Sequence, residues 1–156
     1  MENNTNLQVF IDGASRGNPG HAGAGIFITQ GDKELIKTGI YLGLKTNNQA
    51  EYLALALAAF FLKNLPEIEK YKVLIISDSE LLVRQMQGQY KIKNEILLDL
   101  KFLIDKLLSN VHFKIEHVLR EKNKIADKLA NEGINKKNGI PAEFIKLLVE
   151  HGITNI

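Results

Sequence analysis

Short apolar runs rich in β-branched and aromatic residues alternate with polar turns in the first part of the chain. Three such runs, each predicting a β-strand, are residues 7–12, 22–29 and 35–44. The first run leads at once into the turn-rich stretch 13–20, so we expect that strand to stop at Asp12. The polar turn 30–33 joins the other two runs, as in an antiparallel hairpin. The pattern predicts a three-stranded meander.

A long helix and a central strand follow the meander. Thr46 and Gln49 form a Thr-x-x-Gln capping box, and residues 50–65 are rich in Ala and Leu up to the break at Pro66. Because this helix is apolar nearly all round, we expect it to be buried on a sheet. The continuous apolar run 73–77 is typical of a strand covered on both faces.

The second half of the chain is mainly helical. Apolar spacing and breaks predict helices over 79–86, 94–108, 123–135 and 141–150, with a last strand over 111–118. In the third of these helices we expect five inward-facing residues: Ile125, Ala126, Leu129, Ala130 and Ile134. The predicted order is β-β-β-α-β-α-α-β-α-α, an α/β fold. No repeat, linker or low-complexity segment divides it, so we expect residues 1–156 to form a single domain.

Composition narrows the class of protein. A chain of 156 residues with 45% hydrophobic and 24% charged residues is neither disordered nor coiled-coil. It has no Cys, so disulfides, thiolate metal sites and a cysteine nucleophile are excluded, and any metal must be held by oxygen or imidazole. No apolar run approaches the roughly 20 residues of a membrane span, and the polar start lacks the order of a signal peptide. We expect a cytoplasmic protein without a membrane partner.

The charge balance does not by itself indicate a nucleic-acid partner. The net charge is only +2, from 20 basic and 18 acidic residues. Residues 1–78 carry 7 basic and 8 acidic groups, and residues 79–156 carry the remaining 13 and 10, so the excess lies in the second half. A solvated, Lys-rich surface explains this excess without a partner.

Four acids border the predicted core, where acids are locally unexpected: Asp12, Glu51, Asp78 and Asp127. Taken singly, each acid is better explained as a helix cap, a turn residue or a member of a surface ion pair. If the strands that end at Asp12 and Asp78 are parallel neighbours, however, both acids lie at the edge where α/β sheets bind ligands. An ionised carboxylate there costs several kcal/mol unless something compensates it.

A pair of divalent ions would compensate the four acids together. Four carboxylates carry a charge of about −4, which two Mg²⁺ or Mn²⁺ ions balance with the hard oxygen ligands that such ions prefer. Pairs of this kind catalyse in-line phosphoryl displacement by activating water and stabilising the leaving oxygen. The acids therefore indicate phosphodiester hydrolysis.

The contexts of the four acids resemble, in order and spacing, the signature segments of type 1 ribonuclease H. The segments are residues 10–20 (FIDGASRGNPG), 46–51 (TNNQAE), 76–79 (ISDS) and 123–130 (NKIADKLA). The resemblance spans residues 7–135 and leaves 136–156 as a C-terminal helical extension. It implies a ribonuclease H-like fold, a mixed five-stranded sheet with its second strand antiparallel and helices on its flanks. It also implies that the four acids are the metal-binding catalytic set.

The activity implied is that of a metal-dependent endoribonuclease, which hydrolyses the RNA strand of RNA–DNA hybrids and leaves 5′-phosphate and 3′-hydroxyl ends. Asp12 and Asp78 would bridge the ion that positions water, and Glu51 and Asp127 would reach the ion on the leaving side. A non-catalytic module that binds hybrid or duplex RNA is the alternative, and the intact acids argue against it. A related fold for ATP or sugar phosphate transfer needs two lobes, for which the chain is too short.

The resemblance also implies residues that contact the substrate. In the family, the loop after the first strand and the start of the long helix lie against the hybrid; the matching residues here are Arg16, Gly17, Asn18, Asn47, Asn48 and Gln49. Such contacts reach the RNA 2′-hydroxyl, which both donates and accepts hydrogen bonds. The Gly- and Pro-containing loop is equally a tight connection, and Asn47 is equally a helix cap.

The chain departs from the family pattern in several places. The basic, Trp-bearing helix of well-studied bacterial members is absent, which leaves Lys91 and Lys93 in the direct connection 88–94 as candidate phosphate contacts. A Gln common in the family is Glu80 here. The His-bearing loop before the last acid is shortened, so we expect Arg120 to act electrostatically beside the leaving group and His117 to be an ordinary strand-end residue. Residues 136–156 cover the sheet or mediate dimerisation, and we expect a monomer.

Overall fold

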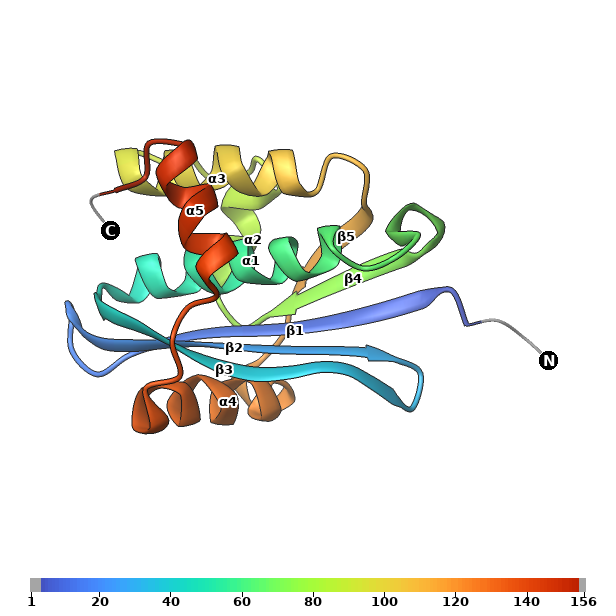
Figure 1. The fold of residues 1–156 in the computed structure, drawn as a ribbon, viewed down its shortest axis with the longest axis horizontal. Coiled ribbons are helices and arrows are strands. Elements are labelled where there is room, and N and C mark those ends of the chain that lie inside the picture. The colour runs from blue at the N-terminus through green and yellow to red at the C-terminus, as the bar shows by residue number, and fades with distance from the viewer. Residues whose placement is uncertain (1–3, 155–156) are drawn as a thin grey trace.

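The computed structural model describes residues 4–154. Within them, one sheet holds five strands in the order β3-β2-β1-β4-β5 (Figure 1). The strands are β1 (Asn6–Ser15), β2 (Gly20–Gln30), β3 (Lys33–Lys45), β4 (Lys72–Ser77) and β5 (His112–His117). β1 pairs antiparallel with β2 and parallel with β4, and β5 is parallel to β4. The meander and the mixed sheet with an antiparallel second strand are confirmed.

The first strand runs further than the sequence predicted. β1 continues through Gly13 and Ala14 to Ser15, because these residues pair with β2 as far as Ala22. The connecting loop therefore holds only residues 16–19, and the expectation that the strand stops at Asp12 is wrong. Small residues that suggested a turn instead allow close packing on the helix above, since a Cβ on Gly13 would lie 2.3 Å from the carbonyl carbon of Ala50.

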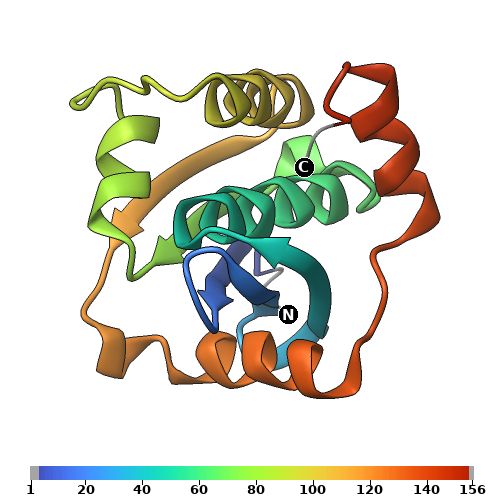
Figure 2. The same ribbon diagram turned by 90° about the vertical axis from the view of Figure 1, so that its left-hand side faces the viewer.

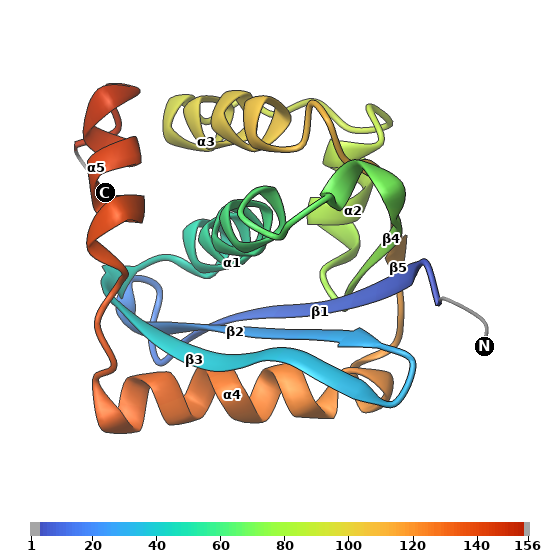
Figure 3. The same ribbon diagram turned by 45° about the vertical axis from the view of Figure 1, so that its right-hand side comes forward.

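Helices cover both faces of the sheet (Figure 3). They are α1 (Asn47–Lys63), α2 (Glu80–Met86), α3 (Glu95–Leu107), α4 (Lys124–Lys136) and α5 (Ala142–Glu150), with short 3₁₀ turns at Ile68–Lys70 and Arg120–Lys122. α1 lies between the sheet and α3, which explains why it is buried on nearly every side, as its sequence predicted. Its capping box is present: Thr46 Oγ1 accepts from Gln49 N at 3.1 Å, and Gln49 Oε1 from Thr46 N at 2.9 Å.

α4 packs on the opposite face, directly against strand backbone. A Cβ on Gly25 would lie 2.0 Å from the carbonyl oxygen of Ala126, so only glycine permits this approach. The buried residues of α4 are Ala126, Leu129, Ala130, Gly133 and Ile134. This i, i+3, i+4, i+7, i+8 arc starts one residue after Ile125, whose side chain is 46% exposed. The expectation that Ile125 points inward is therefore wrong.

The C-terminal segment crosses from one face of the sheet to the other along the edge of β3 (Figure 2). Tyr41 N donates to the Asn138 carbonyl at 2.6 Å, and Asn138 Nδ2 donates to the Gly39 carbonyl at 3.2 Å. α5 then docks through the fully buried Phe144, whose ring lies 5.7 Å from that of Phe60 on α1. The segment thus covers a sheet edge and part of α1 rather than a face of the sheet. No helix within residues 4–154 is long and apolar enough to cross a membrane.

Candidate active site

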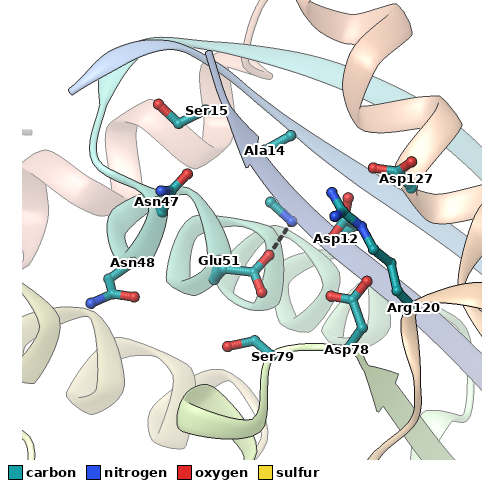
Figure 4. Close-up of a pocket in the computed structure, with 11 residues that line it drawn as sticks. Asp12, Ala14, Ser15, Asn47, Asn48, Glu51, Asp78, Ser79, Arg120 and Asp127 are labelled. Atoms are coloured by element: carbon teal, nitrogen blue, oxygen red, sulfur yellow. Dashed lines mark hydrogen bonds between the residues drawn. The ribbon is translucent and has the colours of Figure 1, made fainter. Parts of the chain in front are cut away.

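Strand register brings two of the sequence-predicted acids together. In the parallel pair β1–β4, Ile11 lies opposite Ser77, so Asp12 and Asp78 follow at adjacent positions. α1 crosses β1 at Gly13, where the two backbones nearly touch, and this crossing places Glu51 beside the strands. The Gly13 amide donates a hydrogen bond to the Glu51 carboxylate, which fixes that side chain (Figure 4).

The acids line a cavity of about 380 Å³ at this end of the sheet. Carboxylate oxygens of Asp12, Glu51 and Asp78 lie within 4.8 Å of one another. Asp127 reaches the same cavity from α4, beside rather than within this cluster of three, and its Oδ1 lies 3.4 Å from Asn131 Nδ2. The cavity is also lined by Gly13, Ala14, Ser15, Asn47, Asn48, Ser79 and Arg120.

Crowding and burial oppose ionisation of these acids. Burial raises the pKa of Asp12 to about 9, and the nearby Glu51 and Asp78 carboxylates add to the rise. Burial raises the pKa of Glu51 to about 8, although the Gly13 amide favours its charged form. Burial likewise raises the pKa of Asp78. The protein alone supplies too little positive charge for three ionised carboxylates, and clustered hard oxygen donors fit a divalent cation.

These pKa shifts predict how the metal-free protein responds to pH. The folded state keeps the Asp12 proton up to pH about 9, while the model value for a carboxyl of this type is 3.8. Between these values the folded state binds more protons, so its free energy of unfolding falls as pH rises. In chelator at pH 8, Asp12→Asn should therefore be more stable by about 2 kcal/mol and melt roughly 4–8 °C higher.

Thermal unfolding at pH 5 and pH 8 checks this prediction. The gain from Asp12→Asn should shrink at pH 5, nearer the pKa of the unfolded chain. Asp99→Asn, which changes an exposed acid on α3, is the control and should move the melting temperature little at either pH. A pH 8 melting temperature for Asp12→Asn that is no higher than wild type would contradict the prediction.

Arg120 is the cation at this cavity, and the sequence singled it out. It opens the 3₁₀ turn after β5, and its side chain extends toward Asp12 and Asp78 in Figure 4. Its positive charge partly offsets the rise in the pKa of both Asp78 and Glu51. His117 ends β5 as an exposed residue and does not line the cavity.

Of the predicted substrate residues around the start of α1, two line the cavity, and two others make hydrogen bonds within the protein. Asn47 and Asn48 are exposed and line the cavity, where their amides are free to face a substrate. Asn18 Oδ1 accepts from Asn47 N at 3.1 Å, so its side chain ties the β1–β2 loop to the helix start. Gln49 caps α1 and lies outside the cavity lining.

The remaining predicted substrate residues lie outside the cavity. Arg16 Nη2 is 3.3 Å from Asn131 Oδ1, so the loop side chain lies against α4. Gly17 has φ 149°, a conformation that favours glycine in this loop. Lys91 and Lys93 are exposed on the connection between α2 and α3.

One buried residue at the site escaped the sequence analysis. Asn123 is 1% exposed, and its Nδ2 donates to the Ile11 carbonyl at 2.8 Å, which ties the start of α4 to β1 next to Asp12. An Asn before a helix reads as an N-cap, yet this side chain makes no capping hydrogen bond. The sequence did contain one signal for this residue, since Asn123 is the first residue of the fourth signature segment.

Comparisons with known proteins agree with this geometry. The family model described as RNase H matches residues 4–135. Ribonuclease HI of Halobacterium salinarum is 36% identical over 133 residues, which are 83% of this chain and 64% of that protein. A bifunctional protein of Mycobacterium tuberculosis is 35% identical over 127 residues, 80% of this chain but 34% of its own length. The chain thus spans only about a third of the mycobacterial relatives that it matches.

A solved structure extends the likeness to three dimensions. The LC11-RNase H1 isolated from compost by a metagenomic approach is 39% identical in sequence and has a TM-score of 0.79. The match covers 85% of this chain and 97% of that one. The same protein in complex with an RNA/DNA hybrid gives a TM-score of 0.74 at 39% identity, with 83% and 97% of the two chains covered. By its family model, its relatives and its fold, the chain belongs to the type 1 ribonuclease H family.

Proposed function

We propose that the protein is an endoribonuclease that hydrolyses the RNA strand of RNA–DNA hybrids and leaves 5′-phosphate and 3′-hydroxyl ends. The observation that carries this proposal is the convergence of Asp12, Glu51 and Asp78, whose carboxylate oxygens lie within 4.8 Å of one another in an open cavity. The hybrid complex of the similar compost enzyme supports the substrate class. Residues 7–135 are the catalytic unit of this proposal.

Divalent ions belong to the proposal because the donor set fits them. Asp12, Glu51 and Asp78 would hold Mg²⁺ or Mn²⁺, and Asp127 on the cavity wall would complete the set for two ions. When bound, such ions supply the Lewis acidity that activates water and stabilises a leaving oxygen. The Gly13 amide keeps Glu51 in place, and Asn123 keeps β1 and the start of α4 together.

Polar residues of the cavity would recognise and orient the RNA strand. Asn47 and Asn48 each offer a side-chain donor and acceptor at the cavity wall. An RNA 2′-hydroxyl also donates and accepts, so these amides suit a ribose more than a deoxyribose. The guanidinium of Arg120 would bind the scissile phosphate, a contact that an always-protonated planar group makes in bidentate fashion.

A panel of four substrates tests the proposal. Labelled RNA–DNA hybrid, duplex RNA, duplex DNA and single-stranded RNA are incubated with the protein in Mg²⁺, and the products are resolved by length and end group. We expect only the RNA strand of the hybrid to be cut, with 5′-phosphate ends. Binding of the hybrid without cleavage would support the non-catalytic module instead.

Substitution of Arg120 and of His117 tests which of the two residues acts beside the leaving group. Arg120→Ala should lower turnover by roughly one to three powers of ten, the scale of losing one preorganised transition-state contact. His117→Ala should cost much less, because His117 lies outside the cavity lining. Single- and multiple-turnover rates separate chemistry from product release; a large loss for His117→Ala beside a near-neutral Arg120→Ala would reverse the two assignments.

Lys91 and Lys93 test where the hybrid is held. If both contact phosphates, Lys91→Ala with Lys93→Ala should reduce the salt slope of hybrid affinity by about 1–2 units, at ~0.9 per contact. Lys70→Ala with Lys72→Ala is the matched control, because these lysines lie at the other end of β4 from Asp78. Binding is measured in Ca²⁺ over a series of salt concentrations. An unchanged slope in the first variant would place the hybrid elsewhere.

A further inference from the structure

The connection between α2 and α3, residues 88–94 and here called the α2–α3 segment, contains no helix and leads directly from one helix to the next. It exposes Tyr90, Lys91 and Lys93, while Ile92 packs against the core. α2, which leads into the segment, begins two residues after Asp78. Figure 2 shows the yellow-green segment leaving α2 at the upper left. The segment is thus linked by one short helix to the acid cluster.

A buried hydrogen-bonded bridge joins α1 to this segment. The Tyr52 hydroxyl, 1% exposed on α1, donates to Gln85 Oε1 on α2 at 2.5 Å. Gln85, 7% exposed, in turn donates from Nε2 to the carbonyl oxygen of Lys91 at 3.0 Å. Burial raises the pKa of Tyr52 to about 12, so its hydroxyl stays a donor at neutral pH. The bridge starts one residue after Glu51 and ends on a candidate phosphate contact.

Packing alone does not require this bridge. Apolar side chains of similar shape fill an interface of this kind at little or no cost, whereas buried polar groups must be fully paired. What the bridge adds is a fixed position for the Lys91 backbone. Arg84 secures the same segment from the outer side: its Nη1 donates to Gln89 Oε1 at 2.7 Å, and its carbonyl accepts from Gln89 N at 2.9 Å.

We propose that Tyr52 and Gln85 are positioning residues for substrate binding, which hold the α2–α3 segment so that Lys91 and Lys93 face the hybrid phosphates. The inference rests on the proposed function and adds to it the residues that set this contact. A segment ordered before binding pays no ordering entropy when the hybrid arrives. The bridge should therefore act on KM and hybrid affinity, while kcat, set at the acid cluster, stays the same.

The test is the double variant Tyr52→Phe with Gln85→Leu, which removes both polar partners together and leaves neither side chain unpaired. We expect near wild-type thermal stability, kcat within about twofold, and a KM raised roughly five- to twentyfold, on the scale of one or two side chains that must be ordered on binding. Amide exchange in residues 91–93 should become faster. Tyr52→Phe with Gln85→Met, in which Met is unbranched like Gln, provides a second variant that also leaves neither side chain unpaired and should show the same KM effect if the first double variant folds poorly.

Gln87→Leu is the matched control. Gln87 is the same residue type as Gln85 and directly follows α2. Its Nε2 donates to the Ile115 carbonyl at 3.0 Å rather than to the α2–α3 segment. It should leave KM unchanged. Faster exchange in the bridge variants with unchanged KM and hybrid affinity would overturn the proposal, as would unchanged exchange.

The two proposals fail in different ways. If the wild-type protein cuts none of the four substrates, the proposed function is wrong. Hybrid affinity in Ca²⁺ and amide exchange still report on the bridge in that case, because neither measurement needs cleavage. Equal affinities for wild type, the bridge variants and Gln87→Leu would then reject the positioning role as well.

Discussion

Asp78→Asn is expected to reduce hybrid hydrolysis by roughly three powers of ten or more, the scale of losing a principal electrostatic contact in an active site. Asp78 shares a cluster with Asp12 and Glu51 whose carboxylate oxygens lie within 4.8 Å of one another. An amide keeps the shape of the side chain but removes the negative charge that holds a divalent ion. Initial rates in saturating Mg²⁺, under single turnover, measure the loss.

Two controls separate this effect from binding and folding. Hybrid affinity in Ca²⁺ should change little in Asp78→Asn, because the phosphate and 2′-hydroxyl contacts proposed above lie on other residues. Asp105→Asn, which alters an exposed acid on α3, should keep its wild-type rate. A rate for Asp78→Asn close to that of wild type would remove Asp78 from the catalytic set.

Local patterns in the sequence predicted the strands and the helix that carry the acids, and the resemblance to type 1 ribonuclease H predicted that these acids act together. A continuous apolar run ending at Asp78 predicted a central strand, and the capping box at Thr46 set the helix start before Glu51. Parallel pairing of β1 and β4 then put Asp12 beside Asp78, as the ligand edge of an α/β sheet requires. The strand and helix predictions used information within a few residues, whereas the parallel pairing joins distant strands and was a condition that the sequence analysis left open until the family resemblance supplied it.

Features that depend on residues distant in the sequence were harder to predict from local patterns. Gly13 and Ala14 resembled a turn, and only pairing with β2 and contact with α1 make them part of a strand. Ile125 kept helical spacing, but the arc that α4 buries is decided by the glycines of the strands beneath it. Gln85 and Tyr52 are 33 residues apart, and no local pattern links them.

Removing divalent ions is expected to abolish hydrolysis, with recovery when Mg²⁺ or Mn²⁺ is restored. Without a cation the clustered acids repel one another, and their burial keeps protons on Asp12 and Glu51, whose pKa values lie at about 9 and about 8. A metal ion must displace these protons, so its apparent affinity rises with pH across this range. Cleavage that persists in excess chelator would contradict the prediction.

The proton release can be counted directly. Calorimetric titration of the protein with Mg²⁺ or Mn²⁺ at pH 7, in two buffers of different ionisation enthalpy, reports the protons lost for each ion bound. Since both Asp12 and Glu51 carry raised pKa values, we expect about one to two protons to be released. Asp12→Asn has one proton fewer to lose and should release correspondingly fewer. Equal proton release from wild type and Asp12→Asn would mean that Asp12 is already ionised before the metal binds.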